Sequence, residues 1–251
     1  TIGLLWATSQ LVYNVSLSHT SVATNTVLSS TSTVFTFVFS LMICREPFRW
    51  LSFASAVLSF AGCAIVAMSA PQTLDKSAVV NSNLGDALTV LAAAMFALGS
   101  VLLRKFAPED LDLSAYMGTT GLLAACAAPA LLFGAHVAGV ESWEAPPQRV
   151  LAALTLNAAL GCALANYLYN SALLLLSPLV SNICLSLSIP ISAILDEVVL
   201  GQHRFSALWV LGASTVIASV VLATADFDAG GDSLGEGSLK PRREKAEEGE
   251  L

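Results

Sequence analysis

Long apolar runs separated by short polar breaks make up most of this sequence. They predict eight helices, at residues 2–18, 21–44, 50–70, 85–106, 113–138, 150–175, 178–200 and 206–225. A helix of about 20 apolar residues spans the hydrocarbon core of a bilayer, which is about 30 Å thick. The pattern therefore predicts an all-α membrane protein, a polytopic bundle of transmembrane helices that lies in a lipid bilayer.

Proline residues account for several of the breaks between these runs. Pro47, Pro71 and Pro108 lie at the ends of the second, third and fourth runs. Because proline has no N–H and restricts the residue before it, each of these helices is expected to end there. The polar segment 71–84 is interpreted as the connector between the third helix and the fourth.

Two of the apolar blocks resemble each other. Tyr13-Asn14 recurs 156 positions later as Tyr169-Asn170. The same ungapped register pairs three serines of the first block with three of the second: Ser21 with Ser177, Ser30 with Ser186, and Ser32 with Ser188. Duplicated blocks of hydrophobic helices are typical of secondary transporters, which hold their substrate between the two copies.

The duplication also predicts how the chain is organised. The first three helices correspond to the last three, whereas the helices at 85–106 and 113–138 have no earlier counterpart. A complete unit then has five helices, and an odd number places the two units in opposite orientations. We therefore expect eight of ten transmembrane helices in two inverted five-helix repeats. Residues 1–70 are interpreted as the end of the first repeat and 85–225 as the second, in an N-terminally truncated fragment.

Composition agrees with a membrane protein and separates off the C-terminal segment. The chain of 251 residues is 55% hydrophobic and 12% charged, and soluble domains carry about twice that charge. Its formal net charge is −7. Many charged and few apolar side chains follow residue 225, so residues 226–251 are predicted to be a disordered, charged tail.

Basic residues at the predicted helix ends indicate an orientation. Four of them gather on the face that also receives the C-terminal basic cluster, and three fall on the other face: Arg45, Arg49, Arg104 and Lys105 against Lys76, Arg149 and Arg204. Since cytoplasmic loops are enriched in Lys and Arg, the C-terminus is predicted to be cytoplasmic.

Two segments carry a resemblance to a known family. The segment Thr20–Ser32 reads TSVATNTVLSSTS, and Leu185–Ser192 reads LSLSIPIS with Asp196 following. They resemble the fourth and ninth helices of solute carrier family thirty-five, subfamily F, in the drug/metabolite transporter superfamily, which includes EamA-like and nucleotide-sugar-transporter-like proteins. The superfamily ends both helices in Gly-Glu, whereas this chain has Arg45-Glu46 and Gly201-Gln202.

The resemblance implies a ten-helix inverted repeat that carries an organic metabolite across an endomembrane such as the Golgi or the vacuole. It leaves the cargo open, with nucleotide-sugar-like and thiamine-like molecules as candidates. The expected partners are a small-molecule substrate and the lipid bilayer, and a homodimer is left open. We expect no nucleic-acid partner and no cofactor.

Uncharged polar residues inside the predicted spans are the candidates for substrate binding. Asn and Tyr offer directed hydrogen bonds without a buried charge, and Tyr adds a ring for stacking. Packing between helices is the competing interpretation, since small hydroxyl residues let backbones approach closely. The candidates are Tyr13, Asn14, Asn25, Ser29, Asn166, Tyr169, Asn170, Asn182 and Ser186.

Three further residues are candidates for coupling or gating. Asp196 could bind a proton or a cation, or pair with a basic residue, or simply reach water at a helix end. Pro190 frees a backbone carbonyl and permits a kink. Lys105, with Arg104, could meet a phosphate, as a basic residue does in the nucleotide-sugar transporters that the chain resembles, although anchoring at the cytoplasmic face explains both equally well.

Other functional classes lack support in the sequence. The five cysteines and three histidines have no metal-ligand spacing, so no metal site is predicted. No Ser/His/Asp arrangement, glycine-rich phosphate loop or basic-aromatic strip occurs, so an enzyme or a nucleic-acid-binding protein is not expected. The favoured function is a secondary carrier or exchanger with alternating access, and the alternative is a non-transporting scaffold or receptor that retains the fold.

Overall fold

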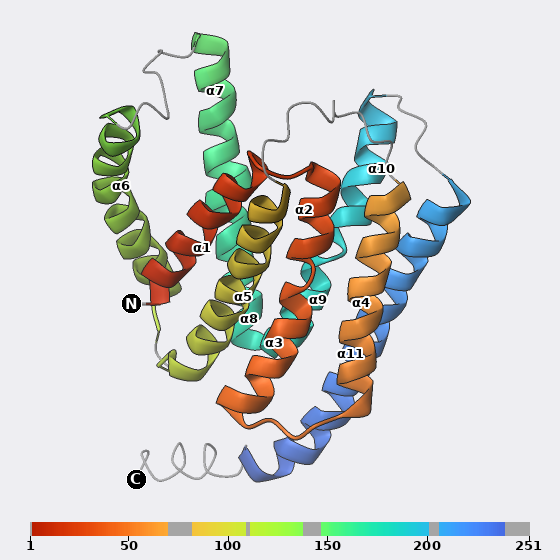
Figure 1. The fold of residues 1–251 in the computed structure, drawn as a ribbon. Coiled ribbons are helices and arrows are strands. Elements are labelled where there is room, and N and C mark those ends of the chain that lie inside the picture. The colour runs from red at the N-terminus through yellow and green to blue at the C-terminus, as the bar shows by residue number, and fades with distance from the viewer. Residues whose placement is uncertain (1, 70–81, 109–110, 138–146, 201–205, 239–251) are drawn as a thin grey trace, which may run out of the picture.

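The computed structural model describes residues 2–69, 82–108, 111–137, 147–200 and 206–238, and every regular element in these ranges is helical. The first part of the chain forms α1 (Ile2–Leu17), α2 (Val22–Ser29), α3 (Ser32–Phe39), the π-helix η1 (Ser40–Cys44) and α4 (Trp50–Ser69). The remainder forms α5 (Ser82–Phe106), α6 (Leu113–Val137), α7 (Gln148–Leu156), the π-helix η3 (Asn157–Leu164), α8 (Ala165–Leu175), α9 (Pro178–Leu185), α10 (Ser188–Leu200) and α11 (Ala207–Ser238). Figure 1 shows them as a single bundle.

Five helical stretches among the described residues are long and apolar enough to cross a membrane. They are Thr24–Cys44, Trp50–Ser69, Asn83–Phe106, Gln148–Leu175 and Ala207–Phe227. A sixth stretch, Pro178–Ser192, is apolar but shorter. The remaining predicted runs form α1 and α6. The protein is thus a helical membrane bundle.

Two helices predicted to be continuous are broken, and the breaks occupy equivalent positions in the duplicated sequence. The run at 21–44 is divided between α2 and α3 at Ser30, and the run at 178–200 between α9 and α10 at Ser186. Each break is bridged by a tight four-residue turn, since the backbone N–H of Thr33 donates to Ser30 O and that of Ile189 to Ser186 O, both at 3.2 Å.

The beginnings of these two broken helices also match. The Ser21 hydroxyl accepts a hydrogen bond from the backbone N–H of Thr24 at the start of α2, and the Ser177 hydroxyl accepts one from Val180 at the start of α9. Each serine satisfies one of the donors that a helix leaves unpaired in its first turn. The paired serines of the sequence repeat therefore have the same structural role.

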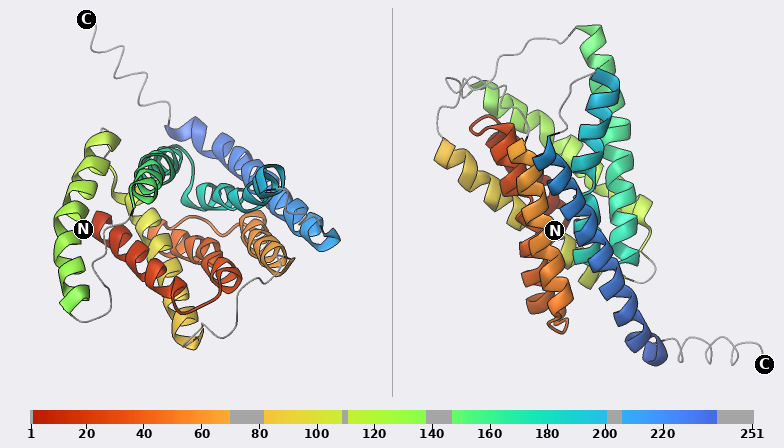
Figure 2. Two further views of the ribbon diagram at one scale, coloured as in Figure 1. Left: turned by 90° about the horizontal axis from the view of Figure 1, so that it is seen from above. Right: turned by 90° about the vertical axis from the view of Figure 1, so that its right-hand side faces the viewer.

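Corresponding helices run in opposite directions through the bundle. In Figure 1, α1 and α4 rise where α8 and α11 descend, and α2 and α3 descend where α9 and α10 rise. Figure 2 places α6 at one edge of the bundle and the adjacent helices α4 and α11 at the opposite edge. The helix α5 packs mainly against α1, α2 and α3.

The last helix is longer than the sequence predicted. A helix was expected to end near residue 225 and a disordered tail to begin at 226, but α11 continues to Ser238. The helix thus continues beyond the apolar run into residues 226–238, a segment that contains acidic and glycine residues. Residues 239–251 of the predicted tail, and most of the connector 71–84, lie outside the described residues.

Candidate functional site

A cavity beside α5 has a volume of about 550 Å³ and is called here the Tyr169 cavity. Its walls come from α1, α5, α6, η3 and α8, and three of the four tyrosines of the chain line it. Its main polar and aromatic lining residues are Trp6, Ser100, Tyr116, Asn166, Tyr167, Tyr169 and Asn170. None of its lining residues carries a formal charge.

Tyr169 is held in the wall of this cavity by two residues of α5. Its hydroxyl lies 3.2 Å from the Ser100 hydroxyl, and its ring contacts the Phe96 ring with centroids 5.6 Å apart. The Asn170 amide donates to Asn166 O at 2.8 Å and lies 3.6 Å from the Met117 sulfur. The candidates Asn166, Tyr169 and Asn170 are therefore brought together in one uncharged, partly aromatic cavity.

A second, smaller cavity of about 250 Å³ contains the equivalent tyrosine of the first copy and is called the Tyr13 cavity. Tyr13 and Ser29, both candidates from the sequence, line it together. Ser9, Gln10, Ser32 and Phe96 add to its wall, and none of its lining residues is charged. The equivalent residues Tyr13 and Tyr169 thus open onto two separate cavities.

Three other candidates, Asn25, Asn182 and Ser186, are buried and make hydrogen bonds between helices. The Asn25 amide on α2 donates to Ser16 Oγ of α1 at 2.8 Å and to Thr89 Oγ1 of α5 at 3.3 Å. The Asn182 amide on α9 donates to Thr36 Oγ1 of α3 at 2.9 Å. These contacts match the packing alternative that the sequence left open.

Ser186 is the third buried candidate. It accepts a hydrogen bond from Ser59 of α4 at 3.1 Å, at the break between α9 and α10. Asn14 lies apart from this group: its side chain is exposed and its amide donates to Gln10 O of its own helix at 2.9 Å. Asn14 lines neither the Tyr13 cavity nor the Tyr169 cavity.

The residues considered for gating occupy helix ends and α10. The Lys105 ammonium donates to Ile43 O at the end of η1 at 2.6 Å, and the Arg104 guanidinium donates to Leu174 O at the end of α8. Both cations therefore meet the negative ends of helix dipoles. Pro190 is buried in α10, and the side chain of Asp196 lies outside what the structure describes.

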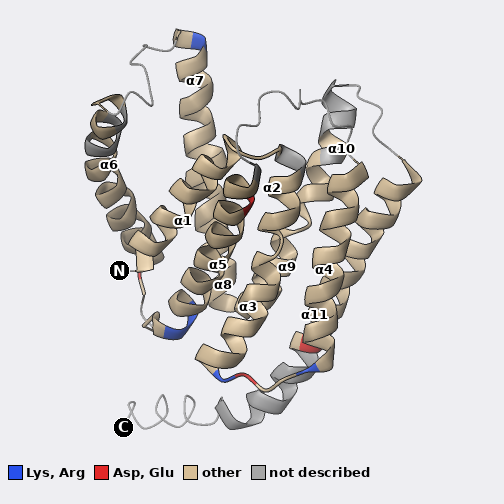
Figure 3. Cartoon of the chain, viewed as in Figure 1, with Lys and Arg blue, Asp and Glu red and all other residues tan. Residues whose placement is uncertain are grey.

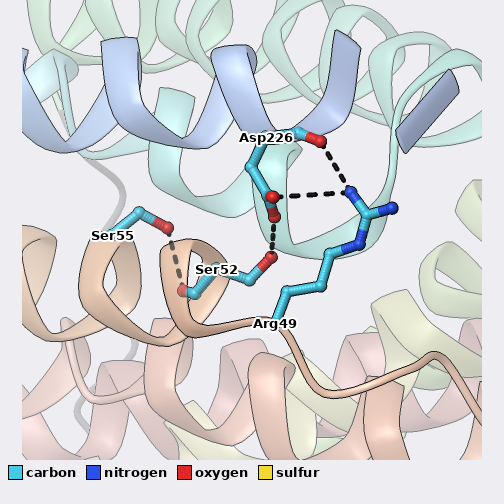
Figure 4. Close-up of polar contacts among 4 residues, drawn as sticks. All are labelled: Arg49, Ser52, Ser55 and Asp226. Atoms are coloured by element: carbon cyan, nitrogen blue, oxygen red, sulfur yellow. Dashed lines mark hydrogen bonds and ion pairs between the residues drawn. The ribbon is translucent and has the colours of Figure 1, made fainter. Parts of the chain in front are cut away.

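A charged cluster joins the start of α4 to Asp226 of α11. The Arg49 guanidinium donates to Asp226 O at 2.8 Å and lies 3.4 Å from Asp226 Oδ1, and the Ser52 hydroxyl donates to the other carboxylate oxygen (Figure 4). Ser55 in the same view bonds within its own helix. This cluster lines a pocket of about 330 Å³.

Sequence reasoning missed this cluster, because Asp226 was assigned to the tail and Arg49 to membrane anchoring. Glu46 and Arg104 line the same pocket. Burial raises the pKa of the Glu46 carboxyl, and the nearby Arg104 and Arg49 partly oppose that rise. Figure 3 shows charged residues gathered at this end of the bundle, where η1 and α5 end and α4 begins.

Among the described residues, His, Cys, Asp and Glu form no group of three or more that could hold a metal ion. The side chains that line the Tyr169 and Tyr13 cavities offer hydrogen bonds and aromatic rings. These two uncharged cavities are therefore suited to binding a small molecule.

Comparison with known proteins gives two family matches. Residues 83–225 match the model of the EamA-like transporter family, and residues 1–111 match a model described as purine nucleobase transmembrane transport. The cattle protein solute carrier family 35 member F5 is 31% identical over 225 residues, which are 88% of this chain and 42% of that protein. A thiamine-repressible mitochondrial transport protein of Saccharomyces cerevisiae is 24% identical over 87% of this chain and 60% of its own length. The chain spans about half the length of the curated relatives it matches.

A solved crystal structure shares this fold. It superimposes with a TM-score of 0.68, covering 88% of this chain and 74% of the other, at 19% sequence identity. At that identity the likeness concerns the arrangement of helices.

Proposed function

The chain belongs to the EamA-like transporter family, and we propose that the intact protein is a secondary carrier that moves a small organic molecule across a membrane by alternating access. The family and the transporters among its relatives support membrane transport. The observation that carries the proposal is the placement of Tyr13 and Tyr169, equivalent in the duplicated sequence, in the walls of two uncharged cavities within the bundle.

The proposal includes two inverted five-helix repeats, of which this chain would hold eight helices. The opposite directions of corresponding helices support it, as do the matching caps at Ser21 and Ser177 and the matching breaks at Ser30 and Ser186. In carriers of this kind, helices broken near the membrane centre surround the substrate, and the repeats move against each other around it. The two broken helices here would have that role.

The lining residues favour one class of cargo over another. Neither cavity is lined by Lys or Arg, so neither offers a cation for a diphosphate group. Tyrosine rings and the amides of Asn166 and Asn170 suit a ring that carries hydrogen-bonding atoms. The proposed cargo is therefore closer to a thiamine-like or nucleobase-like molecule than to a nucleotide sugar.

The proposed location is an endomembrane, with the C-terminus in the cytoplasm. Arg45, Arg49, Arg104 and Lys105 support this orientation, because all four lie at the end of the bundle where α5 ends (Figure 3). The Tyr169 cavity, which contacts the last turns of α5, would then be the nearer of the two cavities to the cytoplasm.

Counterflow in proteoliposomes that contain the full-length protein tests the proposal, with thiamine, purine nucleobases and nucleotide sugars as cargo. We expect counterflow with a heterocyclic cargo, reduced by about tenfold or more in Asn170→Ala. Asn14→Ala is the matched control, because Asn14 is the repeat equivalent of Asn170 and lies outside both cavities. Absence of counterflow with every cargo would favour the scaffold or receptor alternative.

A further inference from the structure

The two cavities follow each other along the bundle. On α5, Ala92, Ala93 and Phe96 line the Tyr13 cavity, and the next turns, Gly99 to Leu103, line the Tyr169 cavity. On α1, which runs in the opposite direction, the order is reversed, with Ile2 and Trp6 at the Tyr169 cavity and Ser9 to Tyr13 at the other (Figure 1). The cavities therefore lie at successive levels along α1 and α5 rather than side by side.

One aromatic pair lies where these levels meet. Phe96 belongs to the wall of the Tyr13 cavity and Tyr169 to the wall of the Tyr169 cavity, and their rings contact each other at 5.6 Å with an angle of 31° between the planes. Ser100, one helical turn after Phe96, lies 3.2 Å from the Tyr169 hydroxyl. The side chain of Tyr169 is thus held against α5 at its ring and at its hydroxyl.

We propose that the Phe96–Tyr169 pair is an internal gate that separates the two cavities and opens when the Tyr169 side chain leaves α5. This inference rests on the proposed carrier function. Opening breaks one hydrogen bond between uncharged hydroxyls and one ring contact, and interactions of this kind are weak enough to break by thermal motion. With the gate open, the cavities join into a continuous uncharged passage that is lined by both tyrosines.

The surroundings of Tyr13 differ from those of Tyr169, although the two tyrosines are equivalent in the sequence. Tyr13 shares its cavity with Phe96, whereas Tyr169 contacts the Phe96 ring from the other cavity. Phe96 lies on α5, which packs mainly on α1, α2 and α3, whereas Tyr169 lies on α8. A movement of α8 relative to α5 and the helices on which α5 packs would therefore change this contact directly.

Cysteine labelling tests the gate without knowledge of the cargo. In the full-length protein, Cys44, Cys63, Cys126 and Cys184 are replaced by Ala. Cys162 remains as the reporter of the Tyr169 cavity, and in a second protein it is also replaced and Ser29→Cys reports on the Tyr13 cavity. The probe is a membrane-impermeant trimethylammonium-ethyl methanethiosulfonate, added to sealed vesicles on the face from which Cys162 reacts.

With the aromatic pair intact, we expect Ser29→Cys to react from that face at least about tenfold more slowly than Cys162, because the reaction requires the open state. Phe96→Ala should raise the Ser29→Cys rate by about tenfold and leave the Cys162 rate unchanged. Tyr169→Phe, which keeps the ring and loses the hydroxyl, should raise the labelling rate of Ser29→Cys by about threefold. Phe96→Val is the second variant should Phe96→Ala fold poorly.

Phe39→Ala is the matched control, because Phe39 stacks on Phe35 at 6.2 Å and lines neither cavity. Equal rates at the two reporters with the pair intact, or no increase in both Phe96 variants, would overturn the gate. Gated labelling without counterflow would leave the gate standing and remove the carrier proposal. Counterflow together with equal labelling rates at the two reporters would support the carrier proposal and remove the gate.

Discussion

Gly62 of α4 and Gly212 of α11 lie against each other where these two antiparallel helices pack closely. A Cβ atom at Gly62 would lie 2.7 Å from Val216 Cγ2 and 3.0 Å from Gly212 O, and one at Gly212 would lie 2.8 Å from Val66 Cγ2 and 3.0 Å from Gly62 O. The contact is therefore nearly symmetric between the two helices. Small residues permit close approach of backbones between membrane helices, where dispersion contacts provide much of the stability.

Replacing either glycine by alanine should weaken this helix pair. We expect Gly62→Ala and Gly212→Ala each to destabilise the protein by about 1–3 kcal/mol, because the added methyl group meets backbone atoms that cannot move aside independently. The change is measured as the shift in melting temperature in detergent, with size-exclusion chromatography used to monitor the fraction of folded protein. Gly134→Ala is the control, because a Cβ there meets nothing within 4 Å. Equal melting temperatures for all three variants would contradict the prediction.

The positions of the helices could be predicted from the sequence, whereas their breaks could not. The apolar run at 21–44 continues through Ser30 and Thr31 without a proline or glycine. In the structure, the Ser30 hydroxyl donates to Val27 O at 2.6 Å and the Thr31 hydroxyl to Leu28 O at 2.5 Å. Such bonds compete with the helical hydrogen bonds of the backbone. Because a hydropathy pattern contains no information on them, it could not predict the break.

The grouping of the candidate residues depended on packing between helices far apart in the sequence. The repeat identified Tyr13 and Tyr169 as equivalent candidates, but it could not show that they line two different cavities. Phe96, which lies between these cavities, looks like any apolar residue of α5 in the sequence. Its role follows only from its contact with Tyr169, 73 positions away.

The buried asparagines should affect stability more than the exposed one. Asn182 is 3% exposed and its amide donates to Thr36 Oγ1, so Asn182→Ala removes a bond between α9 and α3 and leaves a small void. We expect a loss of about 1–2 kcal/mol, within the range for polar contacts between membrane helices. Asn14→Ala should change stability by less than about 0.5 kcal/mol. Similar losses in the two variants, measured by thermal unfolding in detergent, would show that Asn182 contributes no specific contact.

The ion pair between Arg49 and Asp226 should stabilise the contact between α4 and α11. The Arg49 side chain is 33% exposed and the Asp226 side chain 12% exposed, so water weakens the pair only in part. A double-mutant cycle with Arg49→Ala and Asp226→Ala should give a coupling energy of about 1 kcal/mol, lower at high salt concentration. Ser55→Ala is the control, because Ser55 bonds to Ser52 O and not to Asp226. Purely additive effects would mean that the pair contributes nothing.

The Glu46 carboxyl should make stability depend on pH. It lies in the loop between η1 and α4, where burial raises its pKa above the ordinary value despite the opposing charges of Arg104 and Arg49. A carboxyl with a raised pKa in the folded protein favours folding most when protonated. Its contribution is therefore fully present below about pH 4 and is lost as the pH rises through the folded-state pKa.

Glu46→Gln should consequently be slightly more stable than the unmodified protein at pH 7, with a difference that disappears near pH 4. The size should stay below about 1 kcal/mol, because protein atoms surround the Glu46 carboxyl only in part, the residue as a whole is exposed, and water screens the effect. Melting temperatures of the two proteins between pH 4 and pH 7 provide the measurement. A Glu46→Gln protein that is less stable at pH 7 would show that attraction to Arg104 and Arg49 outweighs the cost of burying the carboxylate.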